Sequence, residues 1–228
     1  ITRWFPAATR GSDQIAYVTT AGGASDTAKD NRIHVVKQSD LSVVVSSDPA
    51  DGPILNFTYY KRSLSPYDAR LFAVVDTNGD GVGDQIKAYI DDGTNITALA
   101  DAFGEKSYAE GILSLMTIRL PGDGNPDPEV EPYVPADQSS NRRMFFVAGQ
   151  SLYKVNVDIN DVADNGDKTY GETVWTEGTY KYEGTGMLNY VNGTDDMYVS
   201  CSGLVAAGED GETVAKTIRI TRPWNAAG

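Results

Sequence analysis

The sequence has one cysteine and one histidine, and each scarcity excludes a class of site. Cys201 has no second cysteine to pair with, so no internal disulfide framework holds the fold. Because His34 is the only histidine, a multi-histidine metal site, a histidine-bound haem and a Ser-His-Asp triad are not expected. His34 lies in an apolar alternating run, which predicts a core or strand-face residue rather than a general base.

Positive charge is also scarce, because 19 Lys and Arg stand against 32 Asp and Glu and the net charge is −13. A surface of that sign repels phosphate backbones and anionic lipid, so neither nucleic acid nor a membrane surface is an expected partner. No apolar run approaches the ~20 residues that span a bilayer. No signal-type segment begins the chain, and we interpret Ile1, in place of Met, as the mark of a processed or excised product.

Helical periodicity is rare, whereas short runs of Val, Ile, Tyr, Phe and Thr recur between clusters of Gly, Asp, Asn and Pro. The best helix candidate, residues 97–108, is interrupted by Gly104 and is expected to be a loop or a single turn. A chain of 228 residues with 40% hydrophobic content can supply a core. The sequence therefore predicts an all-β protein.

Four segments, of about residues 1–50, 51–110, 111–182 and 183–228, repeat one order of elements. Each has a small apolar strand, a strand like Leu-Phe-Ala-Val-Val, a strand like Ile-His-Val-Val and a variable outer strand, and the fourth segment lacks its last strand. The expected strands are 3–8, 14–20, 32–38, 41–47, 54–60, 70–76, 85–90, 95–100, 112–120, 143–148, 151–158, 173–182, 186–191, 196–202 and 214–221.

Two stretches resemble those of a known family. Residues 64–74, Leu-Ser-Pro-Tyr-Asp-Ala-Arg-Leu-Phe-Ala-Val, resemble the Ser-Pro-Asp-Gly-Arg-Leu-Tyr-Val signature of YVTN and TolB-like β-propellers. Residues 31–36 followed by 39–43 are similar to the hairpin of the same propellers. The resemblance implies a single propeller-like domain, residues 1–228, with four blade-type repeats. A β-sandwich of about a dozen strands fits the same alternation and stays open as the alternative.

Three insertions lengthen the repeats, at residues 22–31, 76–84 and 121–141. On a propeller, equivalent hairpin insertions emerge on one face, and such loops usually bind partners. The proline-punctuated acidic stretch 121–135 cannot be a central strand, because proline donates no hydrogen bond to a ladder. We expect it to be an extended surface loop, which could contact a partner or stay solvated.

The insertion at residues 76–84 has the oxygen spacing of a calcium loop. Four side chains occupy its positions 1, 3, 5 and 9: Asp76, Asn78, Asp80 and Asp84. Gly81 stands at position 6, where the chain must turn sharply, but position 12 is Lys87 instead of the bidentate Glu of an EF-hand. The loop instead resembles those of thrombospondin type 3 repeats, dockerins and PilY1-type pilus proteins, which implies bound Ca²⁺. An acidic turn that stays solvated without metal is the alternative.

A second oxygen-rich run follows residue 157 and offers Asp158, Asn160 and Asp164 as weaker candidate ligands. Three triplets have the Asn-X-Thr form of N-glycosylation sites and begin at Asn56, Asn95 and Asn192. They are compatible with export from the cell, although such triplets also arise by chance in a chain rich in Asn and Thr.

These features predict a secreted or cell-surface protein, stabilised by calcium, that works by binding or assembly. The expected partners are other proteins, further copies of the chain or carbohydrate, as in an adhesive, appendage or surface-layer subunit. The alternative is an extracellular carbohydrate-active enzyme that uses two carboxylates across a cleft. No pair among 32 acidic residues can be chosen from the sequence, so no catalytic residue is named.

Overall fold

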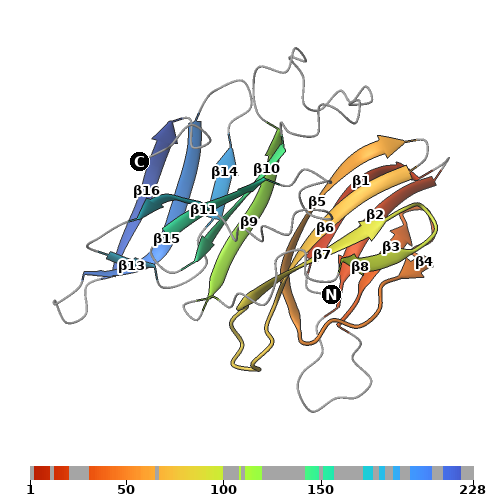
Figure 1. Ribbon diagram of the computed structural model, residues 1–228, viewed down its shortest axis with the longest axis horizontal. Helices are drawn as coiled ribbons and strands as arrows, with labels where there is room; N and C mark the ends of the chain where they lie inside the picture. Colours follow the sequence, from red (N-terminus) through yellow and green to blue (C-terminus); the bar gives the residue numbers. More distant parts are fainter. Residues whose placement is uncertain are drawn as a thin grey trace. The chain divides into compact units, whose positions relative to one another are not determined.

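The computed structural model describes residues 3–10, 13–20, 31–64, 67–99, 108, 111–119, 142–148, 151–156, 172–176, 180–182, 187–190, 196–206 and 213–221. The regular elements in this part of the chain are β-strands (Figure 1), and no helix in it is long and apolar enough to cross a membrane. The prediction of an all-β protein is confirmed.

The chain forms two compact units, Ile1–Ser107 and Tyr108–Gly228. Among the described residues, each unit has two antiparallel sheets of four strands. The boundary between the units falls close to the predicted junction between the second and third repeats. The single domain expected over residues 1–228 stays a prediction.

The first unit has two sheets whose strands pair in chain order, β1-β2-β3-β4 and β5-β6-β7-β8 (Figure 1). The strands of the first sheet are β1 (Arg3–Arg10), β2 (Asp13–Thr19), β3 (Ile33–Lys37) and β4 (Val43–Ser46). Those of the second are β5 (Ile54–Leu64), β6 (Tyr67–Val75), β7 (Gln85–Asp91) and β8 (Ile96–Leu99).

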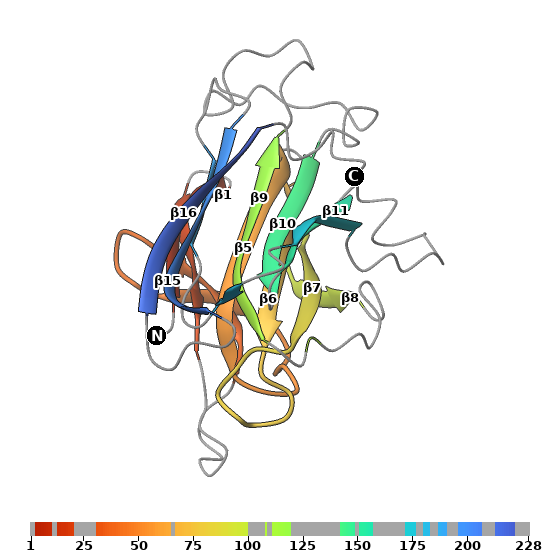
Figure 2. The same ribbon diagram turned by 90° about the vertical axis from the view of Figure 1, so that its left-hand side faces the viewer.

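The second unit has one sheet in chain order and one that departs from it. The strands of the ordered sheet are β9 (Ile112–Arg119), β10 (Arg142–Ala148), β11 (Ser151–Asn156) and β12 (Glu172–Thr176). Those of the other sheet are β13 (Tyr180–Tyr182), β14 (Met187–Tyr190), β15 (Asp196–Ala206) and β16 (Thr213–Thr221). In Figure 2, β9 lies beside β10, and β15 lies beside β16.

Two sequence predictions are wrong in this second unit. Residues 173–182 do not form one outer strand, because β12 pairs with β11 while β13 pairs with β15. The fourth sheet is therefore not one strand short, since β13 supplies its fourth strand. Leu204 and Val205 of β15 pair with both β13 and β16, so β13 and β14 share the edge of β15 that lies opposite β16.

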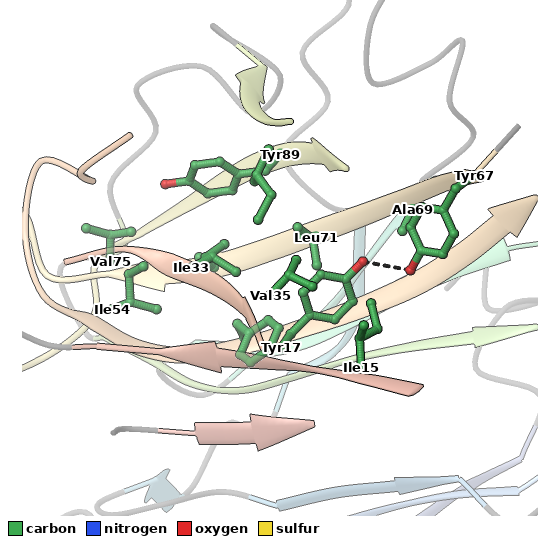
Figure 3. Close-up of a cluster of buried hydrophobic side chains, with 13 residues drawn as sticks. Ile15, Tyr17, Ile33, Val35, Ile54, Tyr67, Ala69, Leu71, Val75 and Tyr89 are labelled. Atoms are coloured by element: carbon green, nitrogen blue, oxygen red, sulfur yellow. Dashed lines mark hydrogen bonds between the residues drawn. The ribbon is translucent and has the colours of Figure 1, made fainter. Parts of the chain in front are cut away.

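The core of the first unit lies between its two sheets (Figure 3). Strand β6 is buried along almost its whole length, as expected of an apolar run paired on both sides. The side chains that form the cluster come from β2, β3 and the second sheet: Ile15, Tyr17, Ile33, Val35, Ile54, Phe57, Tyr67, Ala69, Leu71, Ala73, Val75, Tyr89 and Ile96. Burial of this apolar surface, at about 25 cal/mol per Å², holds the two sheets together.

A hydrogen-bonded group crosses the core. The hydroxyl of Tyr17 on β2 donates to Asp91 Oδ2 over 2.8 Å and lies 2.8 Å from the hydroxyl of Tyr67 on β6. Asp91 is fully buried, and its Oδ1 accepts a hydrogen bond from the amide of Gly93. Burial, followed by the effects of Tyr67 and Asp91, raises the pKa of Tyr17 far above its usual range. This group ties β2 of one sheet to β6 and β7 of the other.

Candidate metal centre

The predicted calcium loop joins β6 to β7, both internal strands of the second sheet, and we refer to it as the 76–84 loop. Backbone hydrogen bonds fix both of its ends. The amide of Asp84 donates to Val75 O over 2.9 Å, and the amide of Asp76 donates to Pro53 O over 3.0 Å. The loop is thus anchored on its own hairpin and on the chain that leads into β5.

Asp76 lies at the base of the loop with 3% of its surface exposed. Its Oδ1 accepts from the amide of Gly79 at 2.7 Å, and its Oδ2 accepts from the amide of Gly81 at 2.8 Å. Both glycines have positive φ, 80° and 88°, which a residue with a Cβ adopts only at a cost. A Cβ at either glycine would meet nothing within 4 Å, so these positions need glycine for backbone conformation alone.

Asn78 and Asp80 repeat the same turn on the exposed side of the loop. Asn78 Oδ1 accepts from the amide of Asp80 at 2.9 Å, and Asp80 Oδ1 accepts from the amide of Val82 at 2.8 Å. The Asn78 amide group also donates to Asp80 Oδ2 over 3.1 Å. In such turns the side-chain oxygen of an Asn or Asp accepts a hydrogen bond from the backbone amide two residues further along, which bends the chain at that point.

Asp84 closes the loop and is also buried, with 5% of its surface exposed. Its carboxylate accepts from the backbone amide of Thr77 at 2.8 Å and from the Thr77 hydroxyl, which lies 2.8 Å from Oδ2 and 3.1 Å from Oδ1. Thr77, at an even position of the pattern, holds Asp84 in place. Sequence reasoning missed it, because a ligand pattern gives the even positions no role.

Two further glycines at the base of the loop were missed as well. A Cβ on Gly52 would lie 1.8 Å from the carbonyl oxygen of Asp76, and a Cβ on Gly83 would lie 2.1 Å from Val74 Cγ1. Neither has a positive φ, so each is needed for space rather than for conformation. The Gly-Pro pair that precedes β5 was visible in the sequence, but its contact with residue 76 depends on the pairing of β5 with β6.

Lys87, at position 12 of the pattern, does not approach the loop carboxylates through a described ion pair. Its Nζ lies 3.2 Å from Asp51 Oδ2, on the segment before β5. Asp51 is largely exposed, so solvent screens this ion pair. The position where an EF-hand has its bidentate Glu is therefore a lysine on β7 that pairs with the segment preceding β5.

The donor set of the 76–84 loop fits a hard cation in chemical type, with three carboxylates and one amide oxygen. An oxygen that accepts one N–H retains a second lone pair, so the turns described above leave it able to coordinate. In the part of the chain that the structure describes, however, no three Asp, Glu, His or Cys side chains are grouped closely enough to hold a metal ion. Calcium here remains a proposal.

The other predicted site residues are placed in part. Asn95 lies in the turn between β7 and β8, and Asn56 lies within β5. Four predicted site residues lie outside the described residues: Asp158, Asn160, Asp164 and Asn192. The same is true of nearly all of the 22–31 insertion and of the whole 121–141 insertion, which includes the acidic stretch 121–135.

His34 is half-buried on β3, between two hydroxyl groups. Its Nδ1 lies 2.7 Å from Ser46 Oγ, and its Nε2 lies 3.3 Å from Thr20 Oγ1. Both partners belong to neighbouring segments of the same sheet. The prediction of a strand-face histidine is confirmed.

Comparison with protein-family models finds no match for this chain, and comparison with curated proteins finds none either. The likeness to YVTN and TolB-like propellers therefore rests on the sequence stretches that suggested it.

Proposed function

We propose that this chain is a calcium-stabilised binding or assembly module of the cell exterior, built on propeller-type blades. Three of its sheets are four-stranded meanders in chain order, which is how a propeller blade is built. The fourth has the same number of strands in a different order. A β-sandwich also uses face-to-face antiparallel sheets, so the arrangement of the four sheets remains part of the proposal.

The arrangement around Asp76 is the main support for calcium. A carboxylate buried at the base of a nine-residue loop, with both oxygens held by the amides of Gly79 and Gly81, is fixed before any ligand arrives. A preorganised ligand lowers the entropy cost of binding. On the exposed side of the same loop, Asn78 Oδ1 and Asp80 Oδ1 each accept a hydrogen bond from the backbone amide two residues further along, so these side chains are held as well.

Exposed apolar side chains support assembly. Leu41, Val43 and Val44 are 65%, 58% and 43% exposed, and they lie on the β3–β4 hairpin at the edge of the first sheet. Large exposed apolar groups that lie together are typical of contact surfaces. The chain as a whole has a net charge of −13, which favours a partner with an apolar centre and a basic rim.

Calorimetry tests the metal site. Calcium should bind the purified chain, and Asp80→Ala should abolish or strongly weaken binding, because an exposed ligand is lost while the buried anchor Asp76 stays. Asp40→Ala is the matched control: Asp40 is also exposed, and its Oδ1 accepts from the amide and hydroxyl of Ser42 in a similar turn. Equal calcium affinity in both variants and the parent chain would refute the site.

Solution mass tests assembly. Val43→Asp should lower the fraction of oligomer, or the affinity for a captured partner, because it places a charge in the apolar surface. Gln14→Asp, an exposed position on the internal strand β2 of the same sheet, is the control. A monomeric parent chain that gains no partner would leave the assembly proposal without support.

A further inference from the structure

The turn between β7 and β8 presents one Asn-X-Thr triplet on the surface. The carbonyl of Asn95 accepts from the amide of Asp92 at 3.2 Å, and the amide of Asn95 donates to Asp92 Oδ1 over 2.7 Å. The turn also uses Gly93, whose φ is 89°. Its hydrogen bonds engage the backbone of Asn95, and the Asn95 residue is exposed.

The next two residues complete the triplet by strand alternation. Ile96, the first residue of β8, is buried in the core cluster, whereas Thr97 is exposed like Asn95. Because side chains alternate across a strand, Asn95 and Thr97 are directed away from the core together. Strand β8 is the last in its sheet, so no described strand covers its outer edge.

The triplet at Asn56 has the opposite environment. It lies within β5, where Asn56 pairs with Val74 and Thr58 pairs with Phe72. Phe57 is fully buried and Thr58 is buried as well, while Asn56 is only partly exposed and is engaged by other groups. An enzyme that must contact both the Asn and the Thr cannot reach this triplet in the folded protein.

We propose that, in the folded protein, Asn95 is a site of N-linked glycosylation and Asn56 is not. In the reaction, Asn95 Nδ2 forms a bond to C1 of a polyprenyl-diphosphate-linked oligosaccharide, the C1–O bond to the diphosphate breaks, and Nδ2 loses a proton. The diphosphate leaves with the electron pair, so no oxidant or reductant is required. The inference rests on the extracellular location proposed above, because the transfer takes place on exported chains.

A saccharide at this turn would also affect assembly. It would stand beside the edge of β8 that no described strand covers, and a strand edge of this kind can add to another chain. The apolar hairpin at Leu41, Val43 and Val44 belongs to the other sheet of the unit. Glycosylation at Asn95 would thus shield the β8 edge of the second sheet, while the apolar β3–β4 hairpin of the first sheet stays accessible to a partner.

A purified oligosaccharyltransferase with a lipid-linked oligosaccharide tests the site without reference to natural location. The acceptors are the folded full chain and two synthetic peptides, residues 90–100 and 51–61, and mass spectrometry of tryptic digests locates the product. We expect both peptides to be modified, and the folded chain to be modified at Asn95 with at least a tenfold lower yield at Asn56.

Variants separate the site from general effects. Asn95→Gln and Thr97→Ala should remove the product, Thr97→Ser should retain it, and circular dichroism should show unchanged folding in all three. A folded chain that stays unmodified at Asn95 while peptide 90–100 reacts, or one that is modified equally at Asn56, would overturn the proposal. Neither result depends on calcium binding, so the calorimetric test of the 76–84 loop can fail or succeed independently of this one.

Discussion

At the scale of single residues, the 76–84 loop depends on glycines for two different reasons. Gly52→Ala would force a Cβ against the carbonyl of Asp76, which is backbone and cannot rotate away. We expect a loss of about 1–3 kcal/mol of stability, as for other overpacked sites. Gly79→Ala meets open space and adds only the strain of a positive φ, about 1–2 kcal/mol. Urea unfolding should rank them in this order, and the reverse order would contradict the contact at Gly52.

The loss of the Tyr17 hydroxyl should destabilise the core, because this hydroxyl donates a hydrogen bond to the buried Asp91. Tyr17→Phe removes the donor to a fully buried carboxylate, and we expect it to cost about 2–3 kcal/mol. Tyr67→Phe leaves that donor in place and should cost less. Both changes preserve the ring and its packing, so denaturant melts of the two variants isolate the hydroxyls. Equal losses would mean that Tyr17 is not the principal donor to Asp91.

Tyr89 provides a test by pH. Burial, with a smaller effect from Asp51, raises the pKa of Tyr89 from 10.0 to about 12 in the folded protein. Since the folded-state pKa exceeds the unfolded value, the associated stability is complete below pH 10 and is lost as the pH rises toward 12. The full loss of stability amounts to about 3 kcal/mol. Tyr89→Phe should therefore lose less stability than the parent chain between pH 9.5 and 11.5, and parallel curves would contradict this pKa.

At the scale of elements, the hairpin β6–β7 should respond most to metal. Calcium that binds only the folded state adds about 2.7 kcal/mol at a hundredfold excess over Kd. Its removal would also leave Asp76, Asp80 and Asp84 close in sequence in a chain of net charge −13. We expect a chelator to lower the melting temperature and to speed amide exchange in residues 75–85. A melting temperature that is the same with calcium and with chelator would show that the loop does not stabilise the fold.

Most strands were predictable because each is short, apolar or alternating and bounded by turn residues. The pattern in β6 and β7 located both strands to within a few residues. The break between β12 and β13 was not visible, since residues 173–182 read as one β-type run and only pairing with β11 or β15 divides them. The ligand pattern that begins at Asp76 could be recognised, because all of its residues lie within nine consecutive positions and do not depend on strand pairing.

The contacts that sequence reasoning missed are those between residues far apart in the chain. Gly52 meets Asp76 only because β5 pairs with β6, and Tyr17 meets Asp91 only because two sheets share a core. A single sequence holds no signal for either contact. Burial of a polar residue such as Asp91 is a property of packing, which strand periodicity does not specify.

At the scale of the whole molecule, the division into two units allows the architecture to be tested. The core cluster of the first unit lies wholly within residues 1–107, so this fragment should unfold cooperatively on its own. If the four sheets are blades of a ring, the fragment should self-associate through the blade faces that the cut exposes. Light scattering would show it, whereas a folded monomer would favour the β-sandwich.

Three of the four sheets pair their strands strictly in chain order, and this affects how fast the protein folds. Such pairing keeps contacting residues close along the chain, so little loop-closure entropy is lost before each hairpin forms. Proteins rich in local contacts fold faster than those with distant pairings. Each meander can also begin to form without waiting for the rest of the chain. The slow step should then be the meeting of finished sheets, and mutations in the Tyr17–Asp91 contact should mainly accelerate unfolding.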